Sequence, residues 1–283
     1  MSKADTFSGF NPVINFVFFI GAIVFGMFFT DVLYLACALV FSFSYYFTVA
    51  GRSGLGFLAG MIPMFIILSA ASPLFNPNGQ TVLFTWIGGR PYTLEALNYG
   101  VRLAAMFISV LTWFASYNRV MTSDKFMYIF GRTAPSVSLV LSMILRLVPS
   151  FRRKLGQISG ARMCVGKAGS SGTKKEKLDN GMTLVSALTT WALEGGIVTA
   201  DSMRSRGYGS GRRTSFAIYR FDRRDRALLS VMVLLIAAVL VLNLAGGKTA
   251  LTAGAVFYAV FLAIPTIINV TEEIIWRILR SGI

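Results

Sequence analysis

The sequence has no histidine, only two cysteines among 283 residues, and charged residues at just 14% of its length. The missing histidines remove the commonest general base and the commonest metal ligand. Cys37 and Cys164 are far apart, and we expect the first in the membrane and the second in the cytoplasm. Neither a disulfide between them nor a cysteine-rich metal site is therefore expected.

The residues that are abundant are apolar or basic. Hydrophobic residues make up 55% of the chain, the mean hydropathy is +0.65, and the formal net charge is +15. Soluble globular chains carry about a quarter charged residues, so this composition excludes an ordinary soluble enzyme and a disordered basic nucleic-acid binder. It predicts an all-α integral membrane protein with a positive cytoplasmic face.

Six apolar stretches approach the roughly 20 residues that a spanning helix needs. We expect about six transmembrane helices at Val13–Thr30, Val32–Ala50, Gly54–Ala71, Leu97–Tyr117, Ala227–Ala245 and Ala250–Val270. The first four lie in residues 10–118 and the last two in residues 227–272. The first stretch lacks a convincing small-residue cleavage site, so we interpret it as a retained span rather than a signal peptide.

The distribution of lysine and arginine predicts the orientation. Residues 119–226 hold 20 of the 27 lysines and arginines against seven acidic residues. The loops on the other side offer only Arg90 and Lys248. By the positive-inside rule, residues 119–226 are cytoplasmic, and both termini lie on that same side.

This large cytoplasmic region predicts two long amphipathic helices, at about residues 135–166 and 178–206. The apolar stripe of the second helix has small residues at its centre: Ala192, Gly195 and Gly196. Glycine inside a helix costs on the order of 1 kcal/mol relative to alanine, and small residues let another helix approach closely. We therefore expect the two helices to cross near Ala192–Gly196, the alternative being a glycine kink without a partner.

The second helix is predicted to end at Arg204-Ser205-Arg206-Gly207. Gly207 suits the left-handed residue that follows a helix end, and arginines in the last turn face the negative end of the helix dipole. An exposed tip that carries guanidinium groups is suited to docking a partner, since these groups pair well with carboxylates and backbone carbonyls.

Several of these residues resemble the motifs of a known family, the transmembrane T component of energy-coupling factor (ECF) transporters. Met203–Gly209 and the following Gly-Arg-Arg-Thr resemble its second Ala-Arg-Gly signature, with Ser205 in place of alanine. Arg146–Pro149 is similar to the run before the first signature. That signature is more degenerate and allows two registers, Ala161-Arg162-Met163 or Ala161 with Gly166 as the terminal glycine. Asn11-Pro12 is similar to the residues that precede the family's first span.

The resemblance implies a non-catalytic scaffold in the cell membrane of a prokaryote. Two coupling helices would dock onto two ATP-binding-cassette ATPases, which themselves bind ATP and magnesium, so the chain would need no cofactor. A small membrane-embedded substrate-binding S component would pack on the scaffold, and the cargo would be a vitamin or a metal cation. We expect the helix face with Leu141, Leu145, Leu184 and Leu188 to form the sliding contact. Membrane lipids are a further expected partner, and nucleic acid is not.

Two other classes of function remain as alternatives. A standalone channel or secondary transporter would be expected to place ionisable residues in mid-membrane, but Arg102 and Asp31 stand near the ends of predicted spans. A membrane-bound enzyme would need paired carboxylates, a metal set or a nucleophile with a base. The carboxylates of the basic region are instead scattered among arginines.

Overall fold

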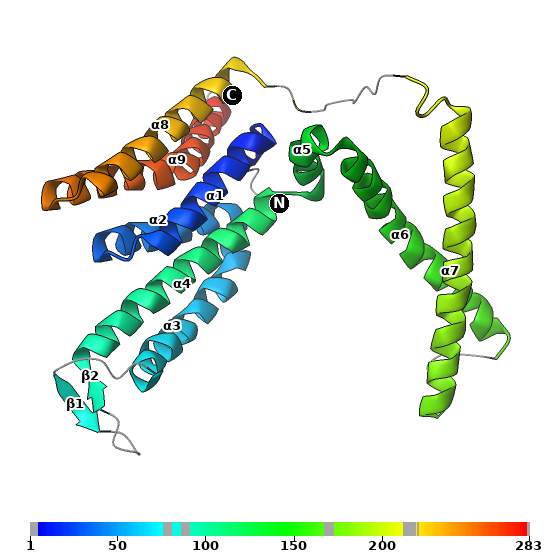
Figure 1. Cartoon of the computed structure of the whole chain (residues 1–283), viewed down its shortest axis with the longest axis horizontal. Coiled ribbons are helices and arrows are strands. Elements are labelled where there is room, and N and C mark those ends of the chain that lie inside the picture. The colour runs from blue at the N-terminus through cyan, green and yellow to red at the C-terminus, as the bar shows by residue number, and fades with distance from the viewer. Residues whose placement is uncertain are drawn as a thin grey trace. The chain divides into compact units, whose positions relative to one another are not determined.

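The computed structural model describes residues 5–75, 81–85, 91–166, 173–211, 219 and 221–281. Nearly all of these residues are helical (Figure 1), as the sequence predicted. The chain divides into two compact units, a membrane unit formed by Met1–Phe126 with Tyr219–Ile283, and a second unit, Met127–Ile218.

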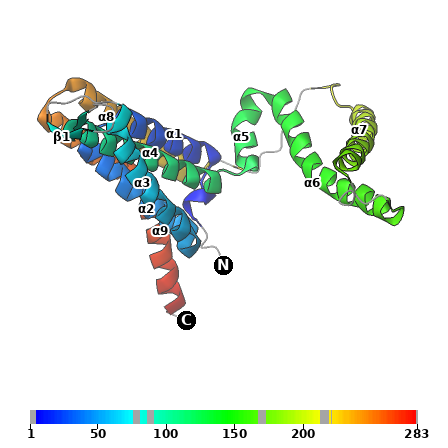
Figure 2. The same cartoon turned by 90° about the horizontal axis from the view of Figure 1, so that it is seen from below.

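Six long helices make up the membrane unit. They are α1 (Pro12–Phe28), α2 (Val32–Ala50), α3 (Leu55–Phe75), α4 (Leu94–Val120), α8 (Arg223–Ala245) and α9 (Lys248–Ser281). Two short 3-10 helices, Phe7–Gly9 and Gly51–Gly54, accompany them. Helix α4 packs against α1, α2 and α3, while α9 packs against α2 and α8 (Figures 1 and 2). Each of the six predicted spans therefore corresponds to a helix of this unit.

Length and composition also identify α6 (Pro135–Cys164) as apolar enough to cross a membrane, together with α2, α3, α4, α8 and α9. Helix α1 has 17 residues and is shorter than this group. At about 1.5 Å per residue it is about 25 Å long, near the lower limit for a span. Helix α9 continues beyond the predicted end at Val270 and passes through Pro265.

Local sequence explains where α1 begins. The Asn11 side chain accepts a hydrogen bond from the Val13 backbone N–H at 3.1 Å, and Pro12 occupies the first turn. Asparagine is among the best N-cap residues, and proline fits the first turn because its missing N–H would be unpaired there. The Asn-Pro pair is thus a helix-start signal.

The core of the membrane unit is aromatic. Trp113 is fully buried and lies 5.4 Å from the Phe18 ring and 5.9 Å from the Tyr45 ring, measured between centroids. The Phe18 ring in turn lies 5.2 Å from that of Phe261. Edge-to-face and offset ring pairs at these distances add stability beyond the area they bury. Specific contacts between aromatic side chains therefore hold α1, α2, α4 and α9 together.

A short hairpin lies in the connection between α3 and α4. Strands β1 (Val82–Thr85) and β2 (Pro91–Thr93) pair in antiparallel fashion. After them the Thr93 side chain accepts a hydrogen bond from the Ala96 N–H at 3.4 Å, which caps the start of α4.

The second unit contains most of α5 (Ser123–Thr133), followed by α6 and α7 (Lys174–Ser205). The two long helices lie close to their predicted positions, and α6 continues through Pro149. Helix α7 begins earlier than predicted because Glu176 accepts a hydrogen bond from the Thr173 N–H at 2.9 Å, as in a capping box. No residue of α6 or α7 is buried within the described part of the chain.

Candidate docking surface

The end of α7 has the hydrogen bonding of a Schellman motif. Gly207 follows the cap residue Arg206 with φ of +79°, a left-handed conformation that favours glycine. Its N–H donates to the Arg204 carbonyl, and the Tyr208 N–H donates to the Met203 carbonyl, both at 3.0 Å. Two otherwise unpaired carbonyls of the last turn are thereby satisfied.

The end of α6 repeats this geometry at Gly166. Gly166 follows the cap residue Val165 with φ of +74°, and its N–H donates to the Met163 carbonyl at 3.0 Å. Gly166 and Gly207 thus occupy equivalent positions after their helices. This equivalence favours the register in which Gly166 is the terminal glycine, and it places Val165 where α7 has Arg206.

The arginines near the two ends have different surroundings. Arg204 and Arg206 of α7 are exposed, as are Ser205 and Gly207. Arg162 of α6 is half-buried, and its Nη2 donates to Asn180 Oδ1 of α7 at 2.6 Å. The end of α7 therefore presents two exposed guanidinium groups, whereas the nearby arginine of α6 joins the two helices by a hydrogen bond. Ala161 beside it is exposed.

Helices α6 and α7 contact each other around Trp191. The rings of Phe151 and Trp191 lie edge to face at 5.6 Å, and Lys154 Nζ lies 5.8 Å from the centre of the Trp191 ring. Ala192 beside Trp191 is half-buried. Gly195 and Gly196 are exposed, and a Cβ placed on either would meet no described atom within 4 Å. The Trp191 contact thus lies next to Ala192 and before the glycine pair in the sequence.

The four leucines predicted for the sliding contact are all half-buried. Leu184 and Leu188 share a face of α7 with Asn180 and Trp191, both of which contact α6. Leu141 and Leu145 are likewise half-buried on α6.

Other apolar residues of the same two helices are more exposed than these four leucines. We call them the exposed apolar stripes. They are Val137, Val140, Ile144, Leu147, Val148 and Leu155 on α6, and Leu178, Met182, Val185, Leu193, Ile197 and Val198 on α7.

A polar cluster, which the sequence analysis also missed, lies where the chain leaves the membrane unit. Lys125 is 5% exposed, and its Nζ donates to the Ser8 carbonyl, to Ser8 Oγ at 2.9 Å and to the Val120 carbonyl at 3.0 Å. Burial lowers the pKa of Lys125, and the charge of Asp5 opposes that shift. The Val120 contact lets the lysine satisfy a carbonyl at the end of α4.

Asp5 extends this cluster to two further helices. Its carboxylate accepts hydrogen bonds from the Tyr45 hydroxyl at 3.0 Å and from Asn269 Nδ2 at 2.6 Å. The N-terminal segment is thus tied to α2 and α9, while Lys125 ties it to the start of α5. A single lysine after a helix end gives no sequence signal for such a set of contacts.

Within the described residues, no group of three or more histidine, cysteine, aspartate or glutamate side chains could hold a metal ion. The arrangement at the ends of α6 and α7 consists instead of exposed backbone turns and guanidinium groups, which can bind a protein surface rich in carboxylates or carbonyls.

Comparison with known proteins identifies a relative of this chain. No protein-family model matches the chain. The chain is 25% identical over 201 residues to the energy-coupling factor transporter transmembrane protein EcfT of Staphylococcus aureus (strain 04-02981). The match covers 67% of this chain and 75% of that protein. Together with the apolar helices, this similarity confirms the resemblance predicted from the motifs: the chain is an EcfT-like membrane protein, similar to the transmembrane component of ECF transporters.

Proposed function

We propose that the chain is the scaffold subunit of an ATP-driven importer, which couples hydrolysis by two ATPase subunits to movement of a substrate-binding S component. The observation that carries this proposal is the pair of equivalent, glycine-terminated ends on α6 and α7. Both ends are exposed, and both belong to a unit whose two long helices have no buried residue. Two similar projecting ends suit two similar partners.

In this function the chain transmits force and catalyses no reaction. ATP and magnesium are bound by the partner ATPases, and the chain itself holds no cofactor. The cargo, a vitamin or a metal cation, is bound by the S component. The region with α6 and α7 lies in the cytoplasm, and the cell membrane holds the remaining helices with both termini on the cytoplasmic side.

The two docking ends have unequal strength in this proposal. Arg206 at the end of α7 supplies a guanidinium group where α6 has Val165. A charged group adds charge-assisted hydrogen bonds that an isopropyl group cannot form. The α7 end is therefore the stronger contact, and the two ATPases need not be identical.

The exposed apolar stripes are the proposed surface for the S component and surrounding lipid. Their large aliphatic side chains are exposed, whereas the four leucines predicted from the sequence are half-buried. The open space over Gly195 and Gly196 allows a partner helix to approach the α7 backbone closely.

Charge reversal at the α7 end tests the docking role. Arg206→Glu is expected to weaken co-purification of the ATPase subunits by about 30-fold or more, since leaving one member of a buried charge pair unpaired costs about 2–5 kcal/mol. Arg206→Lys keeps the charge and should retain most of the binding. Arg152→Glu makes the same reversal at an exposed position within α6 and should leave binding unchanged.

The measurement is the amount of ATPase retained by the tagged chain in membranes, together with cargo uptake in the same cells. Equal retention by Arg206→Glu and wild type, with normal insertion of both, would contradict the proposal.

A further inference from the structure

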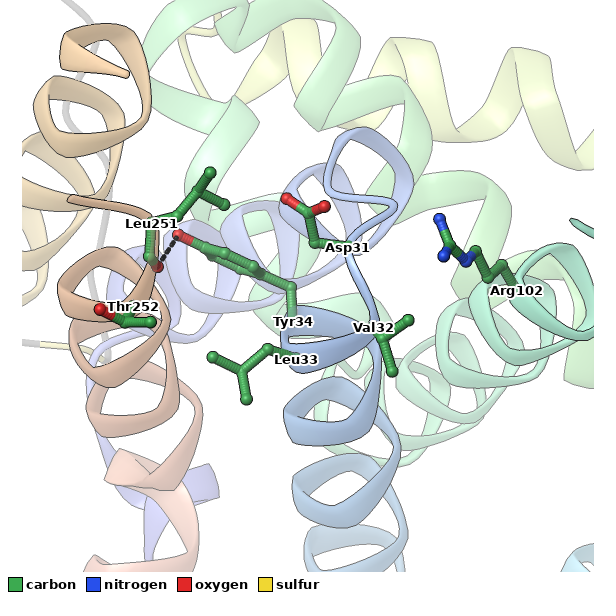
Figure 3. Close-up of a pocket in the computed structure, with 7 residues that line it drawn as sticks. All are labelled: Asp31, Val32, Leu33, Tyr34, Arg102, Leu251 and Thr252. Atoms are coloured by element: carbon green, nitrogen blue, oxygen red, sulfur yellow. Dashed lines mark hydrogen bonds between the residues drawn. The ribbon is translucent and has the colours of Figure 1, made fainter. Parts of the chain in front are cut away.

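A cavity of about 310 Å³ opens at one end of the membrane unit. Figure 3 shows the residues that line it: Asp31, Val32, Leu33, Tyr34, Arg102, Leu251 and Thr252. They come from the turn before α2, from the first turn of α2, from α4 and from the start of α9. The cavity therefore lies where three helices of the membrane unit meet, far along the chain from the docking ends.

Helix lengths place the cavity near a membrane surface. Asp31 immediately precedes α2, which has 19 residues and is about 28 Å long at 1.5 Å per residue. On α4, Arg102 and Arg119 are about 25 Å apart by the same rise. The hydrocarbon core of a bilayer is about 30 Å thick. If Arg119 lies at one surface, Arg102 and Asp31 consequently lie near the other, at the depth of lipid headgroups.

The cavity carries one positive and one negative side chain that do not neutralise each other. Within the described part of the chain, neither Arg102 nor the Asp31 carboxylate has a hydrogen bond or an ion pair. In Figure 3 the Arg102 guanidinium reaches toward Val32, while the Asp31 carboxylate lies on the side of Tyr34. A ligand that fits both groups has an anionic and a cationic part.

The polar group at the back of the cavity, the Tyr34 hydroxyl, already has hydrogen-bond partners within the protein. The Tyr34 hydroxyl donates to the Leu251 carbonyl at 3.2 Å and accepts from Asn243 Nδ2 at 2.9 Å. Tyr34 itself is 1% exposed, so it forms a fixed wall. Val32 and Leu33 are 61% and 51% exposed and offer apolar surface next to the charges.

We propose that this cavity binds the headgroup of an aminophospholipid, with the phosphate at Arg102 and the ammonium group at Asp31. Guanidinium–phosphate and ammonium–carboxylate contacts are charge-assisted hydrogen bonds. Val32 and Leu33 then contact the upper part of the acyl chains. A lipid such as phosphatidylglycerol, whose headgroup has a phosphate but no ammonium group, satisfies Arg102 but leaves the Asp31 carboxylate without a cationic partner, so selectivity arises from the carboxylate.

Lipid retention tests this site without any transport assay. The chain is washed in detergent after reconstitution with equal amounts of phosphatidylcholine, phosphatidylglycerol and phosphatidylethanolamine, and bound lipids are counted by native mass spectrometry. Wild type is expected to enrich phosphatidylethanolamine about fivefold over either other lipid. Arg102→Gln should lower its retention by about tenfold, corresponding to the loss of one charge-assisted contact.

Asp31→Asn sharpens the assignment, because it should abolish the preference for phosphatidylethanolamine over phosphatidylglycerol while total retention persists. Arg146→Gln removes the same charge from an exposed position on α6 and serves as the matched control. Soluble phosphoethanolamine should not displace the bound lipid, since it lacks the acyl chains that contact Val32 and Leu33.

Three results would overturn the proposal: retention unchanged by Arg102→Gln in a normally folded variant, no headgroup preference in wild type, or full displacement by soluble phosphoethanolamine. Native elution and tryptophan fluorescence establish that each variant is folded. The outcome is independent of ATPase binding, so the lipid site and the docking role can fail separately.

Discussion

The two units of this chain both contain long helices with large apolar side chains, but one unit buries many of these side chains and the other leaves them exposed or half-buried. In the membrane unit, aromatic residues of α1, α2, α4 and α9 pack into a shared core, and Trp113 is fully buried among them. In the second unit, α6 and α7 have no buried residue and contact each other through the Trp191 ring and the Arg162–Asn180 hydrogen bond.

This difference indicates what each unit uses for stability. An aromatic core fixes helices by contacts within the chain, so the membrane unit can act as a rigid base. Helices α6 and α7 leave large aliphatic side chains exposed along their lengths, and such contiguous apolar surface marks an interaction site. This exposed apolar surface is where the proposed function places lipid and partner subunits.

The largest expected effect on stability comes from replacing a tryptophan by alanine in the membrane unit, compared with the same replacement in the second unit. Trp113→Ala should destabilise the chain by about 3–5 kcal/mol, since it removes a large side chain from a packed core. Trp191→Ala should cost about 1 kcal/mol, mainly through the lost ring pair with Phe151. The measurement is the fraction of monodisperse protein that remains after heating, and similar losses for the two variants would break the comparison.

Replacing glycine by alanine should have opposite effects on stability at Gly100 and at Gly196. A Cβ at Gly100 of α4 would lie 2.6 Å from the Ser69 carbonyl and from Ser72 Cβ of α3, so Gly100→Ala should cost about 1–3 kcal/mol through overpacking. At Gly196 a Cβ would meet no described atom within 4 Å, and Gly196→Ala should stabilise helix α7 by about 1 kcal/mol.

Heat resistance reports the first change, and the rate of tryptic cleavage within α7 reports the second. A Gly196→Ala variant that is cleaved faster than wild type would show that the space over Gly196 is not open.

The smallest expected effect concerns the lysine at the junction of the units. Burial penalises the charged form of Lys125, so its pKa in the folded protein lies below the ordinary value of 10.5. The cost of burying the charged lysine is present at lower pH. It is relieved as the pH rises from the lowered pKa of the folded state toward 10.5, the value of the unfolded state. The unfolding temperature of wild type should therefore rise relative to that of Lys125→Met over this window, by about 2 °C.

The slope with pH is the informative quantity, because Lys125→Met also leaves the Ser8 and Val120 carbonyls without their donor at every pH. Lys175→Met removes the same charge from an exposed position and should show no such slope. A constant difference between wild type and Lys125→Met across the window would contradict the assignment of a buried, charged lysine.

The sequence was most informative where a repeating pattern or a local signal determines structure. Apolar runs of about 20 residues predicted the helices of the membrane unit because a helix of that length satisfies its own backbone hydrogen bonds across the lipid. Gly207 predicted the end of α7 because the left-handed residue after a helix favours glycine. Asn11-Pro12 is equally local and marks the start of α1.

What could not be predicted depends on contacts between distant residues. The buried environment of Lys125 requires Ser8, and the charged cavity brings Asp31 and Arg102 together from separate helices. The small residues of α7 predicted a close crossing near Ala192–Gly196. In the structure α6 contacts α7 at Trp191, next to Ala192, and at Asn180, and helical spacing alone does not identify these two contacts. The Thr173–Glu176 cap was visible in the sequence as a capping-box pattern and was overlooked.

Hydrogen exchange of the membrane-embedded chain, with and without the two ATPase subunits of the proposed complex, tests the docking role most directly. The account predicts that binding of the ATPases slows exchange in peptides containing Gly166 and Gly207, more strongly at Gly207, and leaves α1 unchanged. Exchange that remains equally fast at both glycines in the assembled complex would contradict it.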